Sequence, residues 1–137
     1  MAKIENIQVD QYRIPLPVVL SDSTHGDMSA FELVTVRVRD ADGAEGVGYT
    51  YTVGRGGSAI RALIADDLTP LLMGHDADLV EENWRLMWWA SHYVGRGGLT
   101  VHAISAIDIA LWDLKAKRAK LPLWRLLGGA DNKVKAY

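Results

Sequence analysis

Residues 31–40 show the clearest alternation of apolar and polar positions in the chain. Val34, Val36 and Val38 alternate with threonine and arginine, so apolar side chains recur at every second residue. This is the period of a strand whose two faces differ in polarity. The segment therefore predicts a β-strand in which the valines share one face.

Two further strands flank this segment. Residues 3–14 are strand-like, and the prolines that follow at 15 and 17 predict the end of that strand, because proline has no amide donor for the ladder. Residues 46–51 predict a third strand, with its valine and two tyrosines on one face. An Asp-Gly pair before it favours a tight turn. Such short connections predict an antiparallel meander.

Helical periodicity replaces this alternation after residue 57. Ser58 can cap a helix that runs to about Leu68. Asp78, with Glu81 three residues later, forms a variant capping box before a tryptophan-rich helix. Residues 99–120 predict the longest helix, of roughly six turns. Strands followed by helices indicate an α+β domain, a three-stranded antiparallel meander followed by a helical bundle.

The C-terminal residues predict a short helix and then a strand. Pro122 suits the first position of the helix, and a Gly-Gly pair at 128–129 predicts its end. Residues 133–137, KVKAY, resemble the start of another strand. We therefore expect one domain at 1–130, followed at 131–137 by the first strand of a second domain in a longer protein.

The composition excludes several classes of function. The formal net charge is −2, so the chain has no general attraction to nucleic acid or to an anionic membrane. Cysteine is absent, which rules out disulfides, thiolate metal sites and a cysteine nucleophile, and which fits a reducing cytoplasm. No apolar run approaches the roughly 20 residues of a membrane span. We expect a cytoplasmic protein that binds neither nucleic acid nor membrane.

The pentapeptide Val-Gly-Arg-Gly-Gly occurs twice, at 53–57 and at 94–98. Neither copy is followed by the lysine of a phosphate-binding P-loop, and the residues before the two copies differ in predicted structure, which argues against a duplicated module. Each copy can form a glycine turn that starts a helix and places Arg55 or Arg96 beside free amides. The alternative is that both arginines are solvated and the glycines only turn the chain.

Motifs for metal binding and nucleophilic catalysis are weak. The four histidines lack the spacing of metal ligands. His25 lies close to serine and threonine residues, but neighbours in sequence do not define a catalytic triad. The cations at the end of the longest helix complement the helix dipole, which explains them without nucleic acid.

The segment from 103 to 129, AISAIDIALWDLKAKRAKLPLWRLLGG, is the most specific in the chain. Small residues leave one flank of its helix open to close packing, and Asp108 and Asp113 are spaced one helical turn plus one residue apart. The segment resembles the first signature of the mandelate racemase/muconate lactonizing enzyme group of the enolase superfamily. The positions that fit are Ala103, Ser105, Ala106, Ile107, Asp108, Ala110, Leu111, Asp113, Leu114, Ala116, Lys117, Pro122, Leu123, Leu126, Leu127 and Gly128. A meander followed by a helical bundle also resembles that superfamily's N-terminal capping domain.

This resemblance implies a capping domain that precedes a modified (β/α)₇β barrel, which is absent from this chain. In such enzymes the barrel holds Mg²⁺ through three acidic residues and carries the acid/base groups. The common step is abstraction of the proton α to a carboxylate, with the metal stabilising the enediolate. The resemblance therefore implies a small-molecule carboxylate substrate and a Mg²⁺ cofactor bound outside these residues. It implies no catalytic residue and no metal ligand within them.

In the family, two loops of the capping domain close over the barrel mouth and contribute to specificity. Here they correspond to residues 18–28 and 50–57. Their polar side chains are the candidates for substrate binding, namely Ser21, Asp22, Thr24, His25, Tyr51 and Arg55. Such groups favour a hydroxylated substrate, so we expect a sugar acid and an acid-sugar dehydratase. The alternative is that these residues are polar only because surface loops are exposed.

Other functions stay open on the sequence. Racemisation and cycloisomerisation share the proton-abstraction step with dehydration. Outside the enzymes, a free-standing α+β binding module fits the same strands and helices. The superfamily implies a homo-oligomer, and the tryptophan-rich helix is compatible with one.

Overall fold

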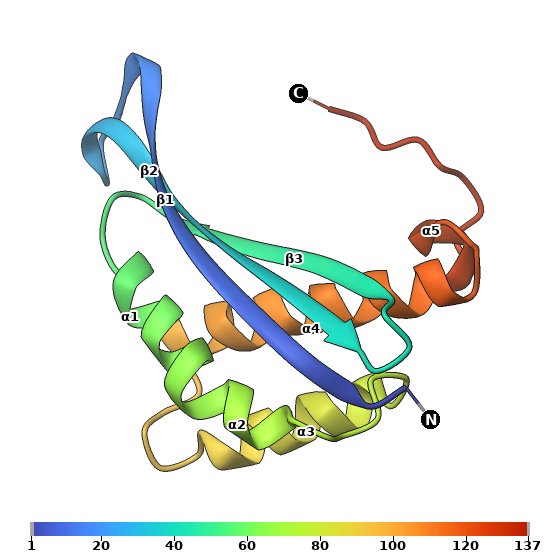
Figure 1. Ribbon diagram of the computed structural model, residues 1–137. Coiled ribbons are helices and arrows are strands. Elements are labelled where there is room, and N and C mark those ends of the chain that lie inside the picture. The colour runs from blue at the N-terminus through green and yellow to red at the C-terminus, as the bar shows by residue number, and fades with distance from the viewer. Residues whose placement is uncertain (1, 137) are drawn as a thin grey trace.

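The computed structural model describes residues 2–136 of the 137-residue chain, and these residues form two layers (Figure 1). One layer is an antiparallel sheet in the order β1 (Ile4–Asp22), β2 (Gly26–Asp40) and β3 (Glu45–Thr52). The other layer is helical and consists of α1 (Gly57–Ala62), η1 (Leu63–Leu68), α2 (Thr69–Leu72), α3 (Val80–Ala90), α4 (Leu99–Arg118) and α5 (Leu123–Leu126). The predicted α+β fold is therefore confirmed.

The valine face of β2 lies against the helices. Val34, Val36 and Val38 are fully buried, as the alternation predicts for one face of a strand. They pack in one cluster with large apolar side chains from every long helical segment, including Ile60, Ile64, Leu68, Leu72, Met87, Ile107, Leu111 and Leu114. Burying one such side chain stabilises a fold by roughly 1.5–3 kcal/mol. The core between the two layers is therefore what holds the sheet to the helices.

β3 packs on α4 through glycines. The buried positions of this strand are Gly46, Gly48 and Thr50, and its large side chains lie on the open face of the sheet. A Cβ atom on Gly48 would collide with the backbone carbonyl of Ala106, and one on Gly46 with that of Ala110. The small residues of α4 therefore let the backbones of strand and helix approach each other.

Polar side chains of α4 bind the outer edge of β3. They pair as Asp113 with the Val47 amide (2.8 Å), Lys117 with the Glu45 carbonyl (3.0 Å) and His102 with the Thr50 hydroxyl (2.9 Å). β3 is an edge strand, so its outward amides and carbonyls have no neighbouring strand to bind. The helix supplies these partners, and Asp113 of the signature segment has a structural role here.

β1 is longer than the sequence predicts. It continues through Pro15 and Pro17 to Asp22, so the prediction that the prolines end it is wrong. Because β1 is an edge strand, a proline can turn its missing donor away from the sheet, and the register with β2 shifts between Pro15 and Leu20. The result is a β1–β2 hairpin that projects beyond the helices (Figure 1). The predicted loop at 18–28 is mostly strand, with its turn at 23–25.

Two predicted helix caps do not form. Gly56, with a φ of 94°, takes the N-cap position of α1, so Ser58 lies inside the helix. α3 begins at Val80 without a side-chain cap, and Asp78 donates its own amide to the Asp76 carboxylate. In both places the chain enters the helix through a turn that the capping pattern does not describe.

The helix predicted at 58–68 continues to Leu72. Its middle section, η1, is π-helical, and α2 follows with Pro70 in its first turn. Proline has no amide to donate to the carbonyl four residues earlier, so regular α-helical bonding cannot pass through this point. The longest helix, α4, matches its prediction within two residues at the C-terminal end.

The predicted short C-terminal helix forms as α5, with Pro122 at its N-cap, and Gly128 follows it with a φ of 77°. Residues 130–136 have no regular secondary structure. A strand needs a partner strand for its hydrogen bonds, so the strand predicted at 131–137 and the domain boundary before it stay predictions. Tyr137 lies outside the described residues.

Candidate functional site

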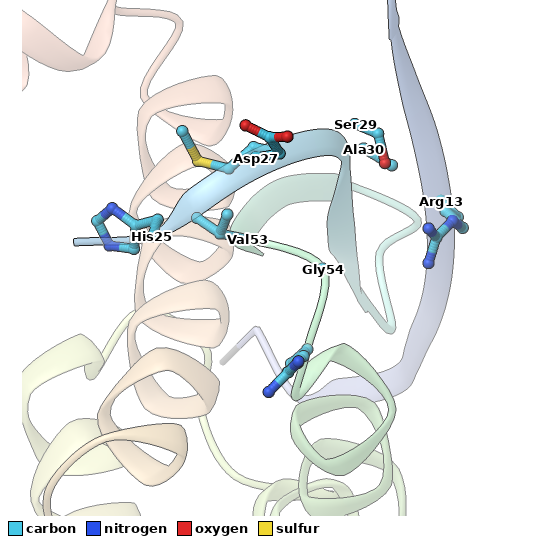
Figure 2. Close-up of a pocket in the computed structure, with 9 residues that line it drawn as sticks. Arg13, His25, Asp27, Ser29, Ala30, Val53 and Gly54 are labelled. Atoms are coloured by element: carbon cyan, nitrogen blue, oxygen red, sulfur yellow. The ribbon is translucent and has the colours of Figure 1, made fainter. Parts of the chain in front are cut away.

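The β1–β2 hairpin and the loop after β3 form a pocket of about 370 Å³ (Figure 2). Its lining residues are Arg13, His25, Asp27, Met28, Ser29, Ala30, Val53, Gly54 and Arg55. Its volume is in the range of small-molecule sites. The two segments that the sequence assigns to substrate binding therefore meet in space, and His25 and Arg55 line the same pocket.

Asp22 and His25 organise the tip of the hairpin. The Asp22 carboxylate accepts hydrogen bonds from the amides of His25 (2.7 Å) and Thr24 (2.8 Å), and it lies 2.8 Å from Nδ1 of the His25 ring. These bonds, with those from His25 the strongest, lower the pKa of Asp22 to about 2. Because Asp22 holds Nδ1, Nε2 is the ring nitrogen of His25 that is left to bind a ligand.

Arginine side chains give the pocket a positive character. Arg55 is exposed in the loop after β3, and Arg13 comes from β1. Asp27 is the carboxylate among the lining residues. Guanidinium groups bind carboxylates in a bidentate manner and also donate to hydroxyls. The pocket is therefore suited to a polar, anionic or hydroxylated ligand.

Not every predicted residue reaches this pocket. Tyr51 lies on the open face of the sheet, where its ring meets Phe31 edge-on with centroids 5.8 Å apart. Ser21 and Thr24 are exposed on the hairpin and do not line the pocket. The loop assignment groups all three with His25, but only the folded hairpin and the loop after β3 show which of their side chains line the pocket.

The structure adds Arg13, Asp27 and Ser29 to the pocket. Asp27 lies within the predicted loop at 18–28, so its position alone could have identified it. Arg13 lies within a predicted strand, and Ser29 lies in the part of β2 that the sequence does not predict as strand. Only the pairing of β1 with β2 places these two beside the loop after β3.

The second Val-Gly-Arg-Gly-Gly copy has a different role. Nε of Arg96 donates to the Trp88 carbonyl at 3.1 Å. Its guanidinium also lies 4.5 Å from the ring centroid of Trp89 and 5.0 Å from that of Trp88. These contacts are cation–π interactions that link the loop before α4 to the end of α3. The same five residues thus form a pocket wall at 53–57 and a helix-to-helix link at 94–98.

Residues 2–136 do not fit a magnesium site. No group of three or more histidine, cysteine, aspartate or glutamate side chains in this range is placed to hold a metal ion. We therefore assign no step of a metal-dependent reaction to these residues. None of the helices in the same range has the length and apolar character needed to cross a bilayer.

Known sequences resemble this chain along nearly its whole length. Residues 3–128 match the mandelate racemase / muconate lactonizing enzyme, N-terminal domain. The 3,6-anhydro-alpha-L-galactonate cycloisomerase of Streptomyces coelicolor is 57% identical over 134 residues, 98% of this chain and 37% of that protein. The L-talarate/galactarate dehydratase of Salmonella typhimurium is 37% identical over 140 residues, 98% of this chain and 35% of that protein.

Solved structures resemble it in the same way. A racemase from Streptomyces coelicolor with bound magnesium has a TM-score of 0.92 and 58% identity, covering 93% of this chain and 36% of that one. An L-talarate dehydratase from a Polaromonas species, complexed with Mg and L-glucarate, has a TM-score of 0.90 and 33% identity, covering 98% of this chain and 37% of that one. The chain therefore spans little more than a third of the length of these relatives.

Proposed function

The chain belongs to the mandelate racemase/muconate lactonizing enzyme group of the enolase superfamily, and we propose that it is the capping domain of a Mg²⁺-dependent enzyme that acts on a sugar acid. The proposed reaction begins with abstraction of the proton α to the substrate carboxylate. That proton is a very weak acid, so the reaction needs a metal and a tuned base. We propose that a barrel domain outside this sequence supplies both, and that the whole enzyme is a homo-oligomer.

The pocket shared by His25 and Arg55 carries the proposal for this domain. Nε2 of His25 and the Arg55 guanidinium can bind hydroxyl or carboxylate groups of the substrate. A site that hydrogen-bonds hydroxyls discriminates strongly against analogues that lack them. The domain's contribution is therefore selection of the substrate rather than its chemical conversion.

Two reactions are candidates for the whole enzyme. The polar hairpin and loop favour dehydration of a sugar acid, which is the reaction named for the 37% identical relative. The 57% identical relative is named as a cycloisomerase of an anhydro sugar acid. The higher identity of this relative is the reason to keep cycloisomerisation as a second candidate. Both reactions begin with removal of an α proton, so it is the substrate that this domain selects that separates them.

The test uses the full-length enzyme with Mg²⁺, assayed on galactarate and on 3,6-anhydro-L-galactonate. We expect His25→Ala and Arg55→Ala each to lower kcat/KM roughly tenfold to a hundredfold, because each loses a charge-assisted or ring-nitrogen hydrogen bond to the substrate. Arg61→Ala is the matched control, since Arg61 is exposed on α1 outside the pocket. Unchanged kcat/KM in both pocket variants would remove them from the site.

A second measurement tests whether this domain has catalytic activity of its own. The 137-residue chain alone is expected to show no turnover of either substrate with Mg²⁺, because its described residues hold neither a metal site nor an assigned base. Clear turnover by the isolated chain would contradict the capping role.

A further inference from the structure

Helices α3 and α4 enclose a groove that the pocket at the hairpin does not use. Two adjoining pockets of about 430 and 240 Å³ lie in it, and both are lined by Trp84 and Asp108. We call this the α3–α4 groove. In Figure 1, α3 lies at the bottom of the helical layer, far from the tip of the β1–β2 hairpin. Each pocket approaches or falls within the size range of small-molecule sites.

Tryptophan rings form the walls of the α3–α4 groove. Trp84 and Trp88 of α3 stack with ring centroids 5.0 Å apart, and Trp112 of α4 lines the larger pocket. The ammonium of Lys115 lies 5.4 Å from the centroid of the Trp112 ring. Indole faces carry negative potential and attract cations. Arg96 contacts the Trp88 ring in the same way, so two walls of the groove already attract a cation from their own chain.

Asp108 lies where the two pockets join. It is partly buried on α4, and its carboxylate forms no hydrogen bond or ion pair with any residue between 2 and 136. Burial raises its pKa above the ordinary value. A carboxylate that loses water without gaining a partner is costly, and an added cation would remove that cost.

The other charges of the groove come from α3. Glu81 and Arg85 line the larger pocket together with Asp108. Arg85 is not within ion-pair distance of Asp108, although a rotation of its side chain could bring its guanidinium to that carboxylate. An anionic ligand would meet two carboxylates here, and a metal ion would find too few ligands among the rings. An organic cation with N–H donors satisfies both the rings and the carboxylate.

We propose that the α3–α4 groove binds a small organic cation, an ammonium or a guanidinium, between the walls of Trp84, Trp88 and Trp112 with Asp108 as its counter-ion. This site is separate from the sugar-acid pocket, and it does not depend on the proposed function. Its ligand is defined by three features: positive charge, N–H donors and a flat or compact shape that stacks on indole.

The test titrates the 137-residue chain with methylguanidinium and follows the indole N–H signals of the three tryptophans by NMR. N-methylurea, which is neutral and similar in shape, separates charge from stacking. We expect saturable shifts with methylguanidinium and none with N-methylurea. Asp108→Asn should weaken binding roughly tenfold, the change that 1.4 kcal/mol produces. Asp67→Asn, on the exposed side of η1, is the matched control and should bind like the unaltered chain.

Five outcomes would overturn the proposal. The first is the absence of saturable binding, and the second is an equal response to N-methylurea. The third is unchanged binding by Asp108→Asn while circular dichroism shows the variant folded. The fourth is a rise in the Asp108 pKa on Arg85→Ala without ligand, since this would show that Arg85 already occupies the groove. Indole shifts that follow protein concentration alone would assign the groove to a second copy, and would equally overturn it.

Discussion

Asp22 and Asp108 carry the same carboxyl group into opposite environments. Asp22 lies at the hairpin tip, where amide and ring donors lower its pKa to about 2. Asp108 lies among tryptophans, where burial raises its pKa. The first is held ionised by its neighbours, and the second is ionised at a cost. Their contributions to stability therefore have opposite dependence on pH.

Asp108→Asn is expected to stabilise the folded chain at neutral pH and to leave it unchanged in acid. The folded pKa of Asp108 is raised above the ordinary value of 3.8, so the native state holds this proton longer than the unfolded state does. Stability therefore falls as the pH rises from about 3.8 through the folded pKa, and the penalty is complete above it. Urea unfolding of both proteins at about pH 3 and pH 7 measures this. A larger stabilisation by Asp108→Asn at the acidic pH than at neutral pH would contradict this prediction.

Asp22→Ala is expected to free the imidazole of His25. Without the carboxylate, Nδ1 loses its acceptor, so both neutral tautomers should be populated and Nε2 should no longer be fixed toward the ligand. The stabilisation from Asp22 itself is present above about pH 3.8 and is lost as the pH falls through about 2. Ring ¹⁵N shifts of His25 report the tautomer, with His75 as an internal control. An unaltered tautomer ratio would remove Asp22 as a positioning residue.

At the scale of elements, β3 and α4 pack so closely that no Cβ atom fits between them at two positions. Gly46 and Gly48 face Ala106 and Ala110, and side chains of α4 bind the strand's outer edge. The helix thus binds two of the backbone groups that a fourth strand would bind at this edge of the sheet. An edge that is covered in this way is protected from pairing with another chain.

Gly48→Ala is expected to destabilise the fold by about 1–3 kcal/mol, because the new methyl group meets backbone atoms that cannot rotate away. Gly97→Ala is the matched control, since a Cβ at that position meets nothing within 4 Å. Chemical denaturation of both variants measures the difference. Equal stability would show that strand and helix separate without cost.

The periodic elements could be predicted from the sequence, and the pocket could not. Val34, Val36 and Val38 of β2 reveal a buried face because burial follows a period of two residues, and α4 is long enough for its pattern to be unmistakable. The extension of β1 beyond Pro15 depends on its being an edge strand, and edge position is set by pairing. Arg13 reaches the pocket because β1 pairs with β2, and this pairing is not visible in the local sequence pattern.

His25 and Arg55 could be predicted as neighbours only through the resemblance to a known family. They lie 30 positions apart in the sequence, and no local pattern joins the hairpin tip to the loop after β3. For Asp108, the sequence identifies the residue but not its surroundings. The signature segment includes it, but its position among tryptophans of α3 becomes visible only when the two helices pack.

For the whole molecule, the main asymmetry is that helices cover only one face of the sheet (Figure 1). The open face carries Tyr12, Ile14, Tyr49 and Tyr51, and these side chains are between 42% and 57% exposed. The register places Tyr12 and Tyr51 on either side of Leu33, so they form one row across three strands. An apolar area of this kind is typical of a surface that contacts another polypeptide.

The 137-residue chain alone is expected to bind an apolar fluorescent dye at this open face. Replacing Tyr49 and Tyr51 by lysine should lower the dye signal severalfold, because both rings are more than half exposed on this face. Tyr93→Lys is the control, since Tyr93 is exposed in the loop after α3. Dye binding that is unaffected by the double substitution would place the apolar surface elsewhere.

The two glycines of β3 also have a consequence for sequence variation. Every codon change that replaces either glycine adds at least a methyl group, and no rotamer can avoid the helix backbone behind it. The residues between and beyond them, Val47 and Tyr49, point to the open face and can vary in size and polarity. In a saturation library across Glu45–Thr52 that is sorted for folded protein, positions that accept substitutions should therefore alternate with positions that do not. The strand that exposes Tyr49 and Tyr51 on the open face would thus also contain two positions that accept no replacement.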